Sequence, residues 1–77
     1  MVQAYVMITV AIGYIHKVIE NISLLENVER VETVSGPCDI ILVVKTSDLH
    51  ELKEFLMVGL RSIDGIMECS TSLVIEP

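Results

Sequence analysis

The residues best suited to recognising a small polar ligand form a turn, Ser35-Gly36-Pro37-Cys38-Asp39. Glycine adopts backbone conformations that other residues avoid, and proline fixes its own φ near about −65° and lacks an N–H, so the pair shapes a tight corner. The corner delivers Asp39 to the start of the most apolar run, residues 40–44. A carboxylate there can accept hydrogen bonds from backbone N–H groups or from a ligand's ammonium. From the residues alone, the local bond within a hairpin turn is favoured over the ligand.

A second polar group is a run of three hydroxyl side chains at residues 70–72. Backbone N–H groups and hydroxyls suit a carboxylate, and Asp39 suits an ammonium. Together, the turn and the hydroxyl run could therefore hold a zwitterion such as a free amino acid. The other interpretation is that Ser and Thr simply occupy a solvated strand face.

Residue sets typical of enzymes and metal sites are missing from the sequence. His16 and His50 each fall near the start of an expected helix, with no Cys or Ser at a spacing that would make a nucleophile pair. Phosphate-binding loops, nucleophile elbows and metalloprotease motifs are absent. Cys38 and Cys69 form no C-x-x-C pair, so zinc is not expected, nor is a disulfide in a reducing compartment. The sequence thus predicts no catalytic residues, no metal and no cofactor.

The composition indicates one small domain, residues 1–77, that associates with other chains. A formal net charge of −6 argues against direct nucleic-acid binding, which needs a basic surface. No apolar run approaches the ~20 residues of a membrane span, and no basic segment precedes the first apolar run, so a cytoplasmic protein is expected. At 52% hydrophobic residues, the chain carries more apolar surface than a small monomer can bury, which predicts an oligomer.

Hydrophobic periodicity predicts strands at residues 4–11, 28–35, 39–46 and 66–76, with helices over 14–26 and 48–63. This βαββαβ order predicts an α+β, ferredoxin-like fold with a four-stranded antiparallel sheet and both helices on one face. The first and third strands are apolar on both faces and belong in the centre. Because no helix remains for the second face of the sheet, we expect two copies to dimerise through it.

Several segments, in this order, resemble the effector-binding domain of the leucine-responsive/asparagine-responsive (Lrp/AsnC) family of prokaryotic regulators. That domain is also called RAM, for regulation of amino-acid metabolism. The matching segments are residues 4–10, the turn at 34–40, the helix at 48–63, and residues 63–66 leading to 71–75. Family members usually carry a helix-turn-helix before this domain. Here the first strand begins within a few residues of Met1, so the chain resembles the stand-alone form without one.

The resemblance implies a domain that dimerises through its sheets, with dimers assembling into larger rings. It also implies that an amino-acid effector binds between dimers, near the turn and the last strand. On that basis the ligand-binding residues are Ser35, Gly36, Pro37, Cys38 and Asp39, with Thr71 and Ser72 second. The family turn commonly has an aromatic residue where this chain has Cys38. The smaller side chain would open the pocket, change its ligand or mark a lost site.

We therefore expect an amino-acid-binding regulatory module and not an enzyme. It would sense a small amino acid at a dimer–dimer boundary and act through oligomer assembly or by joining a full-length Lrp/AsnC-type regulator. Two alternatives stay open. One is a structural assembly module without a ligand. The other is a small dimeric ferredoxin-like enzyme with its site in a sheet cavity, for which Tyr5 and Asp39 are the candidate residues.

Overall fold

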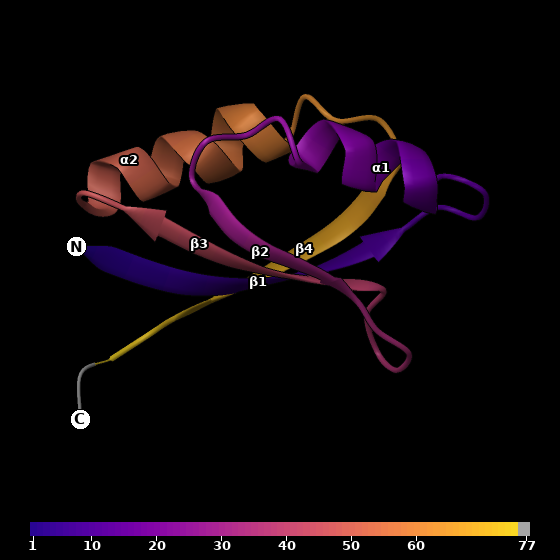
Figure 1. Cartoon of the computed structure of the whole chain (residues 1–77), viewed down its shortest axis with the longest axis horizontal. Coiled ribbons are helices and arrows are strands. Elements are labelled where there is room, and N and C mark those ends of the chain that lie inside the picture. Colours follow the sequence, from indigo (N-terminus) through magenta and orange to yellow (C-terminus); the bar gives the residue numbers. More distant parts are fainter. Residues whose placement is uncertain (76–77) are drawn as a thin grey trace.

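The computed structural model describes residues 1–75, which form a four-stranded antiparallel sheet and two helical segments (Figure 1). The elements in chain order are β1 (Val2–Val10), α1 (Ile15–Ile22), β2 (Val28–Thr33), β3 (Ile40–Thr46), α2 (Leu49–Glu54), its π-helical continuation η1 (Phe55–Leu60) and β4 (Ile66–Leu73). The strand order is β2-β3-β1-β4, so the first and third strands are central. The predicted ferredoxin-like βαββαβ fold is confirmed.

One face of the sheet packs against the helices, and Figure 1 shows both helices on that side. Every second side chain of β1 and β3 points to this face, and the antiparallel register places the two sets side by side. The buried side chains are Ala4, Val6 and Ile8 of β1, Ile40, Leu42 and Val44 of β3, and Val18, Ile22, Leu52, Phe55 and Leu60 of the helices. A slip of one residue would turn each strand's set outward, so this core fixes the register.

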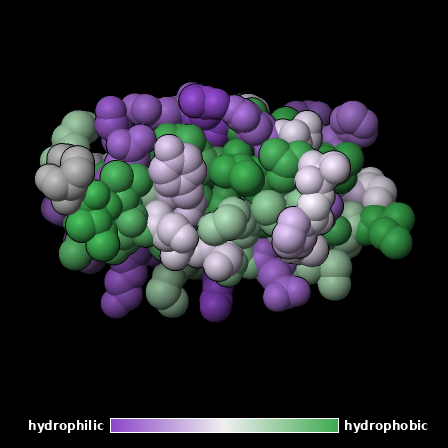
Figure 2. All heavy atoms as spheres, turned by 90° about the horizontal axis from the view of Figure 1, so that it is seen from below, coloured by the Kyte–Doolittle hydropathy of each residue, from purple (hydrophilic) through white to green (hydrophobic). Residues whose placement is uncertain are grey.

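The opposite face of the sheet is covered by no helix within residues 1–75 (Figure 1). We call it the open face. It carries Tyr5, Met7 and Thr9 of β1, Ile41 and Val43 of β3, and Glu68, Ser70 and Ser72 of β4. Figure 2 looks onto the molecule from this side and shows hydrophobic side chains gathered between hydrophilic margins. Exposed apolar bands of this kind are typical of interaction surfaces.

The first helix is shorter than its sequence pattern indicates. α1 ends at Ile22 instead of continuing to residue 26. The Ser23 hydroxyl donates to the carbonyl oxygen of Ile19 at 2.8 Å, and the N–H groups of Leu24 and Leu25 donate to carbonyls three residues earlier. Hydrogen bonds between residues three apart, as in a 3₁₀ turn, are common at the end of an α-helix. Hydrophobic periodicity does not reveal them.

The second helix begins where the sequence predicts. Asp48 Oδ1 accepts a hydrogen bond from the Glu51 N–H at 2.8 Å, and Glu51 Oε1 accepts one from the Ser47 N–H, also at 2.8 Å. This reciprocal pair satisfies N–H groups that a helix start leaves without partners. Leu49, expected on the apolar stripe, is 59% exposed, which is a difference from the prediction. No helix within residues 1–75 is long and apolar enough to cross a membrane.

Candidate ligand-binding site

The turn between β2 and β3 borders a groove at one end of the open face. We call it the turn groove; its volume is about 670 Å³, within the usual size of small-molecule sites. Its floor is formed by Met7, Thr9 and Ile41, and its walls by Val34, Ser35, Gly36, Pro37 and Cys38 of the turn and Glu68, Cys69 and Ser70 of β4. Four predicted residues, 35–38, are therefore brought together around one hollow.

The polar groups of the turn groove come from two elements. Glu68 and Ser70 lie in register with Thr9 and Met7, which places their side chains on the open face beside the floor. On the opposite wall, the backbone N–H groups of residues 35, 36 and 38 donate to no protein atom within residues 1–75. The groove thus brings together the Glu68 carboxylate, a turn whose N–H groups have no protein acceptor within residues 1–75, and apolar side chains.

Asp39 serves the backbone of β1. Its Oδ2 accepts a hydrogen bond from the Val10 N–H at 2.8 Å, and its own N–H donates to the carbonyl oxygen of Ile8 at 2.9 Å. The first bond falls where the register of β1 against β4 shifts, between Thr9 and Val10. The carboxylate therefore has a structural role, as the turn interpretation expects, but its partner lies on β1, 29 residues away, and not within the hairpin turn.

The two remaining predicted residues lie outside the turn groove. Ser72 is on the open face in register with Tyr5, two residues along β4 from Ser70. Thr71 is in register with Val6 and lines a different pocket, on the helix side of β4. Within one chain, neither residue lines the turn groove: Thr71 points to the helix side of the sheet, and Ser72 lies further along β4 from the turn than Ser70.

Glu68 is the charged groove residue that sequence reasoning missed, whereas Ser70 belongs to the hydroxyl run that the sequence singled out. The signal was present, because the alternation of the last strand separates a polar set, which includes both, from Cys69 and Thr71. What the sequence did not reveal was the register against β1, which decides which polar residues of β4 lie beside the turn.

The cysteines and the candidate catalytic residues show no shared site. Cys38 and Cys69 are free thiols; Cys69 is exposed, and partial desolvation by neighbouring atoms raises the pKa of its thiol. Tyr5 and Asp39 are not brought together, since Tyr5 pairs with Val43 while the Asp39 carboxylate binds the Val10 N–H. Within residues 1–75 there is no group of three His, Cys, Asp or Glu residues that could hold a metal ion.

We expect Asp39→Ala to lower the free energy of unfolding by about 1–2 kcal/mol, because it leaves a partly buried N–H group without an acceptor. Asp39→Asn keeps an oxygen acceptor and should retain most of the stability. Urea unfolding followed by circular dichroism measures both, with Asp64→Ala as an exposed control. Equal losses for the Ala and Asn variants would show that the bond to Val10 is not what Asp39 contributes.

Comparison with known proteins decides the family. The sequence model of the Lrp/AsnC ligand binding domain matches residues 3–77. The chain belongs to this family. An uncharacterized HTH-type transcriptional regulator of Pyrococcus abyssi is 31% identical over 71 residues, which are 92% of this chain and 45% of that protein. The chain thus spans less than half the length of the curated relatives it matches.

Solved structures place this Lrp/AsnC domain beside chains of its own size and beside longer regulators. The crystal structure of FFRP-DM1 is 29% identical with a TM-score of 0.93, and the match covers 97% of this chain and 100% of that one. A transcriptional regulator of Neisseria meningitidis, solved as a complex with L-Met, is 17% identical with a TM-score of 0.91. That match covers 97% of this chain and 50% of the regulator, and at this identity it shows a shared fold.

Proposed function

We propose that this Lrp/AsnC domain is a regulatory module that binds a free amino acid in the turn groove and couples its binding to the assembly of copies through the open face. The observation that carries the proposal is the groove itself. It is lined by Glu68 of β4, by turn residues whose N–H groups have no protein acceptor within residues 1–75, and by the apolar side chains of Met7 and Ile41.

Each part of the groove matches one part of an amino acid. Glu68 suits the ammonium, the N–H groups of Gly36 and Cys38 suit the carboxylate, and Met7 and Ile41 suit an apolar side chain. Charge-assisted hydrogen bonds of this kind are about twice as strong as neutral ones. The L-Met complex of the Neisseria regulator, which has the same fold, supports an amino acid as the class of ligand.

Assembly follows from where the groove lies. Met7 and Ile41 belong to the open face and also to the groove floor, so a second copy on the open face would meet the bound ligand. A ligand that contacts the boundary between copies shifts the equilibrium toward the state it binds better. Binding and oligomerisation would then be linked, which makes the module regulatory without any catalytic group.

The same open face suits a longer partner. The curated relatives are HTH-type transcriptional regulators, and this chain matches about 45% of their length. A full-length regulator that carries the same domain would present a corresponding sheet face. We include co-assembly with such a regulator in the proposal, as the route by which a domain of net charge −6 would influence DNA without binding it.

A thermal-shift screen against the twenty amino acids tests the groove. An amino acid present at about 100 times its Kd should stabilise the fold by about 2.7 kcal/mol, a shift of roughly 10–20 °C for a domain of this size. Glu68→Gln should abolish the shift, whereas Glu20→Gln, which removes an exposed carboxylate from α1, should preserve it. A flat screen would instead favour an assembly module without a ligand.

A further inference from the structure

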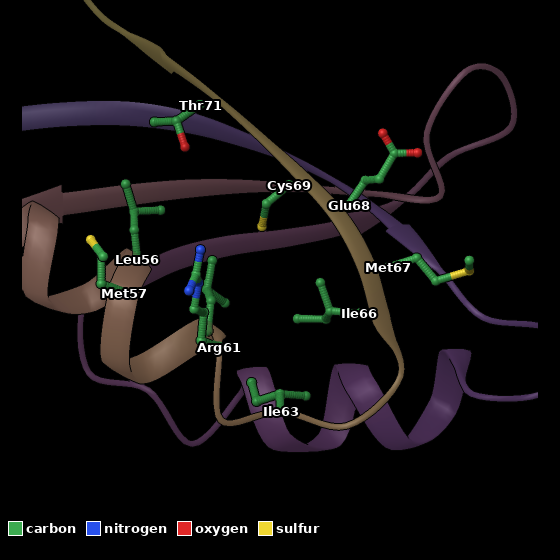
Figure 3. A pocket seen from close by; sticks show the side chains of 10 residues that line it. Leu56, Met57, Arg61, Ile63, Ile66, Met67, Glu68, Cys69 and Thr71 are labelled. Carbon is green, nitrogen blue, oxygen red and sulfur yellow. The ribbon is translucent and has the colours of Figure 1, made fainter.

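A second pocket lies on the helix side of β4 and differs in chemistry from the turn groove. It has a volume of about 410 Å³ and lies between the end of η1 and the strand. Its apolar lining includes Leu56, Leu60, Ile63 and Ile66, and its polar lining residues are Arg61, Glu68, Cys69 and Thr71 (Figure 3). We call it the Arg61 pocket. A small hollow in which polar groups converge beside apolar side chains is a usual form of a ligand site.

Arg61 supplies the only positive charge of this pocket. Figure 3 shows its guanidinium directed from the helix end toward Cys69 on β4. The other arginine, Arg30, is paired with Glu32, but Arg61 forms no ion pair or hydrogen bond with any atom of residues 1–75. A planar guanidinium matches a carboxylate with two parallel hydrogen bonds, so the pocket is equipped to bind an anionic ligand of that shape.

The same pocket lacks a partner for an ammonium group. Glu68 borders it through its position on β4, but its side chain is in register with Thr9 on the open face. Figure 3 shows the Glu68 carboxylate directed away from Arg61. An ammonium group placed in the Arg61 pocket would lose water without gaining a charged partner, which is costly. The charges around the pocket therefore suit a plain carboxylate better than an amine.

We propose that the Arg61 pocket binds a short branched aliphatic carboxylate, of which the 2-oxo acids are one source and simple fatty acids another. Arg61 holds the carboxylate. The aliphatic branch packs on Leu56, Ile63 and Ile66, and the Thr71 hydroxyl is available to a 2-oxo group. This ligand class is distinct from the amino acid of the turn groove, and the two sites use opposite faces of β4.

Isothermal titration calorimetry of the intact chain with four probes of similar shape tests the ligand class. The probes are 4-methyl-2-oxopentanoate, 3-methylbutanoate, L-leucine and 3-methylbutylamine, each at millimolar concentration. We expect the two carboxylates to bind in the Arg61 pocket and the amine not to bind. Tighter binding of the 2-oxo acid would identify the oxo group as recognised, and equal binding would identify the carboxylate alone. Absence of heat from both carboxylates, or equal binding of the amine, would overturn the proposal.

Variants assign the binding to Arg61. Arg61→Gln should weaken the binding of the two carboxylates roughly tenfold or more, since it removes a charged hydrogen-bond donor. Lys53→Gln removes the same charge from the exposed surface of α2, outside the pocket, and should leave the affinity unchanged. Arg61→Lys keeps the positive charge but not the planar guanidinium, so its affinity for the carboxylates should lie between those of the unmodified chain and Arg61→Gln. It replaces Arg61→Gln in the test if the Gln variant does not fold. Unchanged affinity in Arg61→Gln would contradict the proposal.

Alkylation of Cys69 gives a readout inside the pocket. In a Cys38→Ser background, bound carboxylate should slow the reaction of Cys69 with iodoacetamide, because this thiol lines the same hollow. The amine should not slow it, and equal protection by both would overturn the assignment. Glu68→Gln separates this proposal from the amino-acid proposal, since it should remove amino-acid binding but should not weaken carboxylate binding in the Arg61 pocket, which it borders without a favourable contact to an anion.

Discussion

Gly65→Ala should lower the free energy of unfolding by about 3 kcal/mol or more, because it combines backbone strain with a steric clash. Gly65 has a φ of +100°, and a Cβ at this position would lie 2.7 Å from both Cβ and Cδ2 of Tyr14. The Gly65 carbonyl also accepts a hydrogen bond from the Ala11 N–H at 2.8 Å, so the connections after β1 and η1 meet here. For a domain of this size the melting temperature should fall by roughly 10–20 °C.

A matched control separates the clash from the strain. Gly13 also has a positive φ, +84°, but a Cβ there would have no atom within 4 Å. Gly13→Ala should therefore cost only the backbone term, about 1 kcal/mol. Adding Tyr14→Gly, which removes the clashing Cβ as well as the ring, to Gly65→Ala should recover stability relative to the single variant, which a double-mutant cycle in urea measures. Similar losses at Gly65 and Gly13 would show that contact with Tyr14 does not limit residue 65.

Met7→Lys should weaken assembly through the open face. Met7 lies between Ile41 and Ser70 on β1, and the Glu68 carboxylate, in register with Thr9, lies diagonally across from it, so a lysine there would replace apolar packing in the interface by a buried ion pair. A buried ion pair in place of apolar packing costs about 1–4 kcal/mol, which is a weakening of the dimer by roughly 10-fold or more. Sedimentation equilibrium of the variant beside the unmodified chain measures the change.

Met57→Lys provides the control for this experiment. Met57 is the same residue type, is 51% exposed and lies on η1, in the helix layer on the other side of the sheet. The same substitution there should leave dimerisation through the open face intact. If Met57→Lys dissociates the protein and Met7→Lys does not, copies associate through the helices and the proposed interface is wrong.

The fold could be predicted from the sequence because its evidence is local. Alternating apolar residues, a helical stripe and a capping pair of Asp48 and Glu51 each act within a few residues, and the two-sided apolarity of the first and third strands places them centrally. The end of α1 was less predictable, because hydrogen bonds around Ser23 end the helix while the periodicity continues. The uncovered face of the sheet could also be predicted, because the sequence pattern shows only two helices and both were expected on the same face.

The site was harder because its contacts join distant residues. The partner of the Asp39 carboxylate is the Val10 N–H, 29 residues away, and no local pattern identifies it. The alternation of residues shows which residues form the last strand. Only the register of that strand against β1 shows that Glu68 and Ser70 lie beside the turn, while Thr71 lies on the helix side. The residues of the turn itself, 35–38, were predictable because one short segment contains them all.

Sedimentation velocity of the unmodified chain at micromolar concentration, with and without the amino acid that shifts its melting temperature, tests the central claim most directly. We predict a species larger than a monomer in the absence of ligand, and a change in the distribution of species when the amino acid binds in the turn groove. A monomer under both conditions, or an oligomer whose distribution no amino acid alters, would contradict the proposed coupling of ligand binding to assembly.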